Sequence, residues 1–91
     1  MEPVKLPIED VLDLHTFHPG DVPDLLEDYF CECIKAGIYS VRIIHGKGKG
    51  IQKKRVRKLL NNSPMVESFS DAPPEAGGWG ATIAELKKSN P

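Results

Sequence analysis

The sequence predicts an α/β fold: a two-layer sandwich with the element order β-α-β-α-β-β, in which two helices cover one face of a mixed four-stranded sheet. Three observations support this prediction. Apolar residues recur every three or four positions over residues 22–34, as expected of a helix packed on a sheet. Residues 38–44 are rich in β-branched side chains, which favours a short strand. Residues 51–62 follow a glycine-rich turn and show a second helical pattern.

The first predicted strand spans residues 8–15. Near its end the residues alternate, so that Leu12 and Leu14 share one face while Asp13 and His15 share the other. The strand, the helix after it and the strand at 38–44 form a β-α-β unit. Such a unit has parallel strands and a right-handed connection.

The first predicted helix begins after Asp21, a suitable N-cap, and ends before Gly37, a suitable C-terminal stop. The second helix ends where Asn and Pro follow it, at residues 61–64. Its apolar positions Val56, Leu59 and Leu60 are expected to face inward. The cationic side chains expected to face mainly outward are Lys53, Lys54, Arg57 and Lys58. Residues 65–69 and 79–86 are the third and fourth predicted strands, joined by an ordered loop at 70–78.

The composition predicts one compact domain over residues 1–91, with its core at about 8–88, because a chain of this length has room for a single hydrophobic core. A hydrophobic fraction of 40% and a charged fraction of 27% argue against a disordered chain. The sequence has no apolar run of about 20 residues and no apolar signal-peptide core. Cys31 and Cys33 would point to different sides of a helix and stay unpaired. We therefore expect a cytoplasmic protein without a membrane partner, and a monomer.

The charges are strongly segregated. Residues 1–46 carry nine acidic and three basic side chains, residues 47–58 carry seven basic and none acidic, and residues 59–91 carry four acidic and two basic. A local positive charge on a chain with a net charge of −1 favours an anion-binding patch, although a solvated helix face is the ordinary alternative.

The basic segment begins in a turn whose residues are His45, Gly46, Lys47, Gly48, Lys49 and Gly50. Glycines allow a backbone to approach a ligand closely, and the first N–H groups of the following helix favour an anion. The turn lacks the spacing of a P-loop. Two interpretations stay open at this point: a phosphate cradle, and a tight strand-to-helix connection flanked by solvated lysines.

Asp13, His15 and His45 are candidate catalytic residues. Ligands usually bind at the carboxyl ends of parallel strands, where these side chains are expected. A carboxylate beside an imidazole can support proton exchange near neutral pH. The alternative is a polar pair that closes the turn after the first strand. The histidines lack the spacing of a zinc-binding helix, so we predict no metal site and no required cofactor, although Mg²⁺ held by Asp13 and substrate phosphates is conceivable for a DNA substrate.

Trp79 lies among glycines, and Gly78, Trp79 and Gly80 are further candidate nucleic-acid contacts. The ring can stack on a base, as aromatic side chains do in proteins that bind single strands. The alternative is an aromatic side chain that covers the edge of the sheet.

Three sequence blocks resemble the Smr (small MutS-related) domain family over nearly the whole chain. Residues 12–15 match the family's L-D-L-H opening, residues 45–48 its H-G-x-G turn, and residues 77–82 its G-G-x-G-A-T segment. The resemblance implies a fold similar to the C-terminal domain of bacterial translation initiation factor three. It also implies that the chain binds or nicks DNA or RNA, in DNA repair, recombination or RNA quality control. Many members have glycine where Thr16 stands, so we expect a different shape for the turn after His15.

The resemblance assigns Asp13 and His15 to a catalytic D-x-H pair and His45 with its glycines to a substrate-binding turn. The first hypothesis is therefore an endonuclease, with His15 and His45 as proton donor and acceptor and Asp13 as the orienting carboxylate. The second is a non-catalytic module that binds branched or single-stranded nucleic acid. The third is a protein-interaction domain that uses the acidic face of the first helix.

Overall fold

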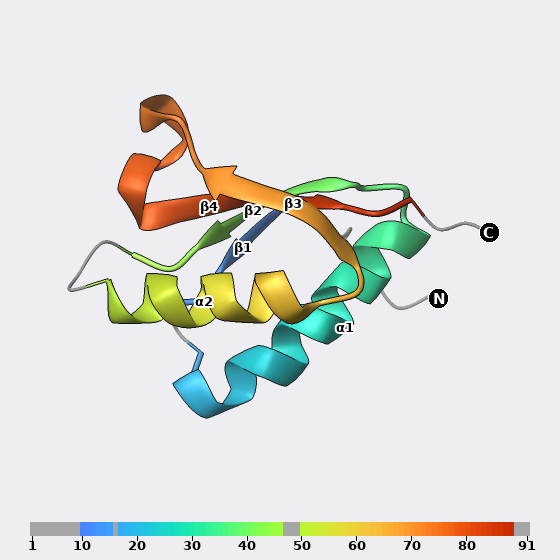
Figure 1. Cartoon of the computed structure of the whole chain (residues 1–91), viewed down its shortest axis with the longest axis horizontal. Helices are drawn as coiled ribbons and strands as arrows, with labels where there is room; N and C mark the ends of the chain where they lie inside the picture. The colour runs from blue at the N-terminus through green and yellow to red at the C-terminus, as the bar shows by residue number, and fades with distance from the viewer. Residues whose placement is uncertain (1–9, 16, 47–49, 89–91) are drawn as a thin grey trace, which may run out of the picture.

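The computed structural model describes residues 10–15, 17–46 and 50–88, and its element order confirms the predicted β-α-β-α-β-β sequence. The strands and long helices are β1 (Val11–Asp13), α1 (Val22–Lys35), β2 (Ser40–Ile44), α2 (Ile51–Asn62), β3 (Val66–Asp71) and β4 (Ala81–Leu86). Single 3-10 turns occur at Pro19–Asp21, Pro74–Ala76 and Gly78–Gly80. Both long helices lie on the same side of the sheet (Figure 1).

The sheet is mixed, with the strand order β1-β2-β4-β3. β1 and β2 are parallel, and β4 lies antiparallel to both β2 and β3. The register places Ile44 opposite both Asp13 and Ala81, so that β1, β2 and β4 meet at one edge. Because β2 leads into α2 at this edge, residues far apart in the sequence are brought together there (Figure 1).

The core lies between the sheet and the two helices. α1 contributes the predicted stripe, of which Val22, Leu26, Phe30 and Cys33 are fully buried. Val56 and Leu60 of α2 pack against the same cluster. As predicted, Cys31 is exposed and both cysteines are free.

Several strand boundaries differ from the prediction. β1 ends at Asp13 because the Asp13 carboxylate accepts the backbone N–H of His15 at 2.8 Å and forms a turn there. β4 begins at Ala81, since residues 78–80 form a 3-10 turn closed by the N–H of Gly80 and the carbonyl of Gly77 at 3.0 Å. β3 runs to Asp71, two residues beyond its predicted end.

The prediction that Lys53 faces outward is wrong. Lys53 is 8% exposed and belongs to the buried side of α2 with Val56 and Leu60. The spacing i, i+3, i+7 places these three side chains on one helical stripe. A lysine can occupy such a position because its four methylene groups pack against apolar neighbours while the ammonium group finds a partner.

Truncating Leu60 to Ala should lower the free energy of unfolding by roughly 2–5 kcal/mol, because the side chain is 1% exposed and its removal leaves a cavity. The matched control on the same helix is Ile51→Ala, since Ile51 is 61% exposed and its truncation should cost far less. Urea denaturation followed by circular dichroism measures both. Equal losses for the two variants would contradict the packing described here.

Candidate nucleic-acid interface

Three candidate residues lie where the parallel strands β1 and β2 end. Asp13 is the last residue of β1 and stands opposite Ile44, the last residue of β2. The backbone N–H of Leu14 donates to the carbonyl of Ile44 at 2.9 Å, which keeps the chain beside β2 up to His15. His45 directly follows β2. The topology thus brings Asp13, His15 and His45 to one edge of the sheet, as the sequence predicted.

Asp13 and His15 form an accessible pair. Their side chains are 56% and 77% exposed, and 3.7 Å separate Oδ1 of Asp13 from Nδ1 of His15. This distance is too long for a hydrogen bond but short enough for the carboxylate to attract a protonated ring. The same Oδ1 atom accepts the His15 backbone N–H, so Asp13 also shapes the turn that presents the imidazole.

Hydrogen bonds hold both the backbone and the ring of His45. Its backbone N–H and that of Gly46 both donate to the carbonyl of Gly80, at 3.0 and 2.9 Å. Nδ1 lies 3.0 Å from the carbonyl oxygen of Gly46, and Nε2 lies 2.8 Å from the hydroxyl of Thr82. Because a carbonyl can only accept, Nδ1 carries a hydrogen, and in the neutral ring Nε2 accepts from Thr82.

The environment favours the neutral form of His45. Burial lowers the pKa of its imidazole below the ordinary value, and the positive charges of Lys53 and Arg57 act in the same direction. The hydrogen bond to the Gly46 carbonyl and the charge of Asp71 oppose these effects only in part.

The glycine turn is described at its two ends, and Lys47, Gly48 and Lys49 lie outside the described residues. Gly46 has a φ of +86°, and Gly50, the N-cap of α2, has a φ of +81°. Both values lie in the left-handed region that glycine adopts without strain. Gly50 has no side chain to cap the helix, so the first N–H groups of α2 lack a side-chain acceptor at the N-cap. These N–H groups can donate hydrogen bonds to a phosphate. The backbone N–H groups of His45 and Gly46 instead donate to the carbonyl of Gly80.

The basic side chains of α2 fall into two sets. Lys53 and Arg57 both pair with Oδ1 of Asp71 on β3, and Nζ of Lys53 lies 2.9 Å from it. The hydrogen bond from Lys53 lowers the pKa of the Asp71 carboxyl, and the charge of Arg57 adds to this effect. The positive charge of α2 is therefore partly compensated by a carboxylate that lies outside the basic segment 47–58.

The second set faces solvent. Lys54 and Lys58, which the sequence predicted to face outward, are exposed together with Arg55. No ion pair joins these three side chains to a carboxylate in the described part of the chain. They form the basic face that is free to neutralise phosphates.

Trp79 stands beside the N-terminus of α2. Together with Gly50, Lys53, Lys54, Arg57 and Asp71 it lines a pocket of about 280 Å³. The ring is 52% exposed, and Nζ of Lys53 lies 4.3 Å from its centroid. Nη1 of Arg42 donates to the carbonyl of Ala76 at 3.0 Å and fastens the loop that carries Trp79 and the neighbouring glycines Gly78 and Gly80 to the sheet.

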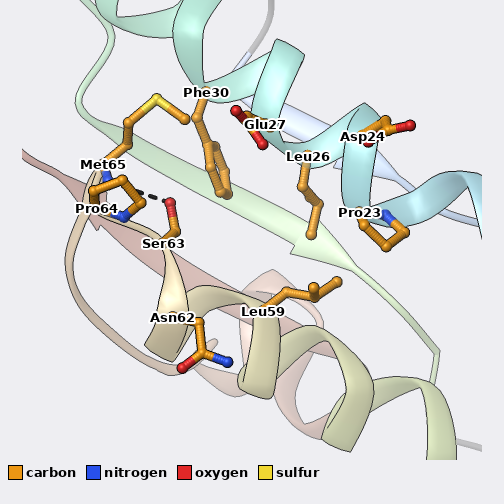
Figure 2. Close-up of a pocket in the computed structure, with 10 residues that line it drawn as sticks. All are labelled: Pro23, Asp24, Leu26, Glu27, Phe30, Leu59, Asn62, Ser63, Pro64 and Met65. Carbon is orange, nitrogen blue, oxygen red and sulfur yellow. Dashed lines mark hydrogen bonds between the residues drawn. The ribbon is translucent and has the colours of Figure 1, made fainter.

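A second pocket, of about 210 Å³, lies between α1 and α2. In Figure 2 the side chains of Leu26 and Phe30 extend from α1 toward α2, which contributes Leu59 to the pocket. The charged residues that line this pocket are Asp24 and Glu27. Their carboxylates repel phosphate, so this pocket does not fit an anionic polymer.

Asp71 and Thr82 are site residues that the sequence analysis missed. The third strand was predicted to end at residue 69, which left Asp71 in a loop. Extending the strand by two residues would have placed Phe69 and Asp71 on one face, toward α2. Thr82 was identified only as a β-branched strand residue, and its bond to His45 depends on the pairing of β2 with β4.

The described residues hold neither a membrane-spanning helix nor a metal-binding cluster. No helix among them is both long and apolar enough to cross a bilayer. Nowhere in this part of the chain do three His, Cys, Asp or Glu side chains gather in a way that could hold a metal ion.

The chain is similar to several curated proteins named Endonuclease MutS2. It is 43% identical over 75 residues to the protein of Helicobacter pylori and 40% identical over 76 residues to that of Shouchella clausii. These alignments cover 82% and 84% of this chain but 10% of each relative, so the chain spans about a tenth of their length.

Two solved structures share the fold. The Smr domain of Thermus thermophilus MutS2 superposes with a TM-score of 0.78 at 32% identity, covering 85% of this chain and 96% of that one. YdaL, a stand-alone small MutS-related protein from Escherichia coli, superposes with a TM-score of 0.81 at 27% identity, covering 92% of this chain and 69% of YdaL. Residues 12–87 match the family described as the Smr domain, and the chain belongs to this family.

Proposed function

We propose that this chain binds nucleic acid across the exposed basic face of α2 and cleaves a phosphodiester bond at the adjoining carboxyl edge of β1 and β2. The observation that carries the proposal is the exposed basic face formed by Lys54, Arg55 and Lys58, which begins beside the edge that presents His15. Lys47 and Lys49 of the turn add formal charge to the same region of the sequence. Phosphate contacts of this kind position nucleic acid without reading its sequence.

The names of the relatives support nuclease chemistry. The two curated relatives described above are endonucleases by name, and the part of this chain that aligns with them is the Smr domain. Asp13 and His15, to which the family resemblance assigns a catalytic role, are both exposed at the edge described above, which supports this proposal.

Among the candidate residues, the geometry favours His15 for proton transfer and Asp13 for orienting and stabilising the charged ring. His15 is exposed and can reach a substrate hydroxyl, whereas His45 uses both ring nitrogens within the protein. We assign His45 a positioning role, in which the neutral ring keeps the glycine turn attached to β4.

The nucleophile of the proposed cleavage would differ between RNA and DNA. RNA offers its own 2′-hydroxyl. His15 would accept the proton of this hydroxyl as its oxygen attacks phosphorus to form a 2′,3′-cyclic phosphate, and the 5′-oxygen would leave with a proton from His15 or water. DNA lacks this group, and a magnesium ion held by Asp13 and the substrate phosphates would supply an activated water. We propose no resident cofactor for the RNA reaction.

A non-catalytic binding module is the second candidate. Asp13 accepts the backbone N–H of His15 and closes the turn, which is the structural role that such a module requires. In that case the basic face would still bind nucleic acid, and replacing both residues would leave binding unchanged.

The two free cysteines suit a reducing compartment, and we propose that the protein acts in the cytoplasm.

Replacing His15 with Ala should lower the cleavage rate by roughly 100-fold or more, because general acid–base catalysis typically contributes 10²–10⁴-fold. The measurement is digestion of matched RNA and DNA substrates, each with and without EDTA. Asp13→Asn should slow cleavage less than His15→Ala does, and both variants should bind as the wild type does. Cleavage by the wild type at no more than the His15→Ala level would rule out the nuclease and leave the binding module.

Replacing His45 with Asn should flatten the pH dependence of stability between about pH 7 and pH 5. The folded state lowers the pKa of His45, so on acidification the unfolded chain takes up the proton first. The stabilisation is therefore complete above the ordinary histidine pKa of about 6.5 and is lost as the pH falls below it. Thermal unfolding across this pH range measures the effect. Circular dichroism verifies that His45→Asn folds, and a wild-type slope in this variant would refute this account.

A further inference from the structure

We propose that Trp79, Lys53, Asp71 and Gly50 form a subsite for one unpaired nucleobase, which stacks on the face of Trp79 that Lys53 leaves open. The subsite deepens the proposed nucleic-acid binding and rests on it. The part of the ligand that the loop recognises is an exposed aromatic base. Lys53 and Asp71 have positioning roles in this subsite, which are distinct from phosphate binding.

A chain of two contacts holds the indole ring. Oδ1 of Asp71 accepts from Nζ of Lys53 at 2.9 Å, and this ammonium group lies 4.3 Å from the centroid of the Trp79 ring. The Lys53 side chain is only 10% exposed, so the ammonium group is a fixed part of the protein rather than a mobile surface charge. One face of the indole is thus covered by a cation in favourable contact with the π-system.

Gly50 lies beside the far end of the indole ring. A Cβ added at this position would lie 3.6 Å from Cη2 of Trp79, and the φ of +81° disfavours any other residue there. The far end of the indole therefore lies close to the start of α2. With one face covered by Lys53, Trp79 is still 52% exposed, which leaves ring surface for a base.

Such a ring suits a base because a rigid aromatic surface loses little conformational freedom on binding. Every nucleobase has a π-face, so the subsite should tolerate any sequence. In a duplex both faces of each base are covered by neighbours. The ligand must therefore be a base in a single strand, at an end or in a branched structure.

Lys53 and Lys54 provide a matched pair of variants. They are adjacent and carry the same charge, but Lys53 is paired with Asp71 under the ring while Lys54 is exposed. A phosphate contact releases counterions and contributes about 0.7 to the salt slope for a single strand. Lys54 should contribute such a slope, whereas Lys53 should not.

The test uses the fluorescence of Trp79, the only tryptophan of the chain, and the anisotropy of a labelled oligonucleotide. The probes are a single-stranded DNA and an abasic DNA of the same length. Anisotropy should report binding of both, with the base-bearing strand bound roughly tenfold more tightly. Only the base-bearing strand should quench Trp79. Failure of both strands to bind would overturn the proposed function, whereas binding of both with equal affinity and no base-dependent quenching would overturn the subsite alone.

The variants distinguish the support that Lys53 gives to the Trp79 ring from the positive charge that Lys54 offers to a phosphate. Lys53→Met should abolish most of the base-dependent quenching and leave the salt slope unchanged, while Lys54→Met should reduce the slope by about 0.7 and keep the quenching. Trp79→Leu, a change at an exposed loop position, should remove the tenfold preference for the base-bearing strand and leave abasic binding intact. Circular dichroism verifies folding of each variant. If Lys53→Met reproduced the changes seen in Lys54→Met, or if Trp79→Leu kept the preference, the subsite would be disproved.

Discussion

The junction between the end of β2 and the start of β4 is the constraint on which the site depends. Two consecutive backbone N–H groups, those of His45 and Gly46, donate to one carbonyl, that of Gly80, and the His45 ring bonds the hydroxyl of Thr82. These bonds join the two glycine-rich segments of the sequence, which lie more than thirty positions apart. They place the strand-to-helix turn, the N-terminus of α2 and the Trp79 loop at one edge of the sheet. A neutral imidazole suits this junction, since a charged ring would lie close to Lys53 and Arg57.

Asp71 divides the cationic side chains of α2 into a paired set and an exposed set. By pairing with Lys53 and Arg57 it converts two cations into structural contacts between α2 and β3. Arg57 also lies 5.4 Å from the centroid of the Phe69 ring, which extends this contact along β3. The remaining cations, Lys54, Arg55 and Lys58, keep their charge for an external anion. The helix thus has a side that packs against β3 and a side whose cations are exposed to solvent.

Much of the fold could be predicted because its signals are local. Helical spacing located α1, and α2 was found with both of its boundaries, because apolar periodicity and the flanking turn residues are properties of neighbouring positions. The strand ends were less predictable. β1 stops where a side chain captures a backbone N–H, and β3 extends to Asp71 because β4 continues to pair with it. The second effect comes from a partner strand that no local pattern reveals.

For the site, the sequence by itself identified the candidate residues: Asp13 and His15 at one strand end, His45 with its glycines at the next, the basic helix, and Trp79. Residue type and spacing carry that information. Only the tertiary structure decided how these residues are used. It directs Lys53 to Asp71 and to the face of Trp79, it engages both ring nitrogens of His45, and it leaves His15 accessible. Charge pairing and hydrogen bonding depend on distances of about 3 Å, and in this protein such distances are set by strand pairing between distant segments of the chain.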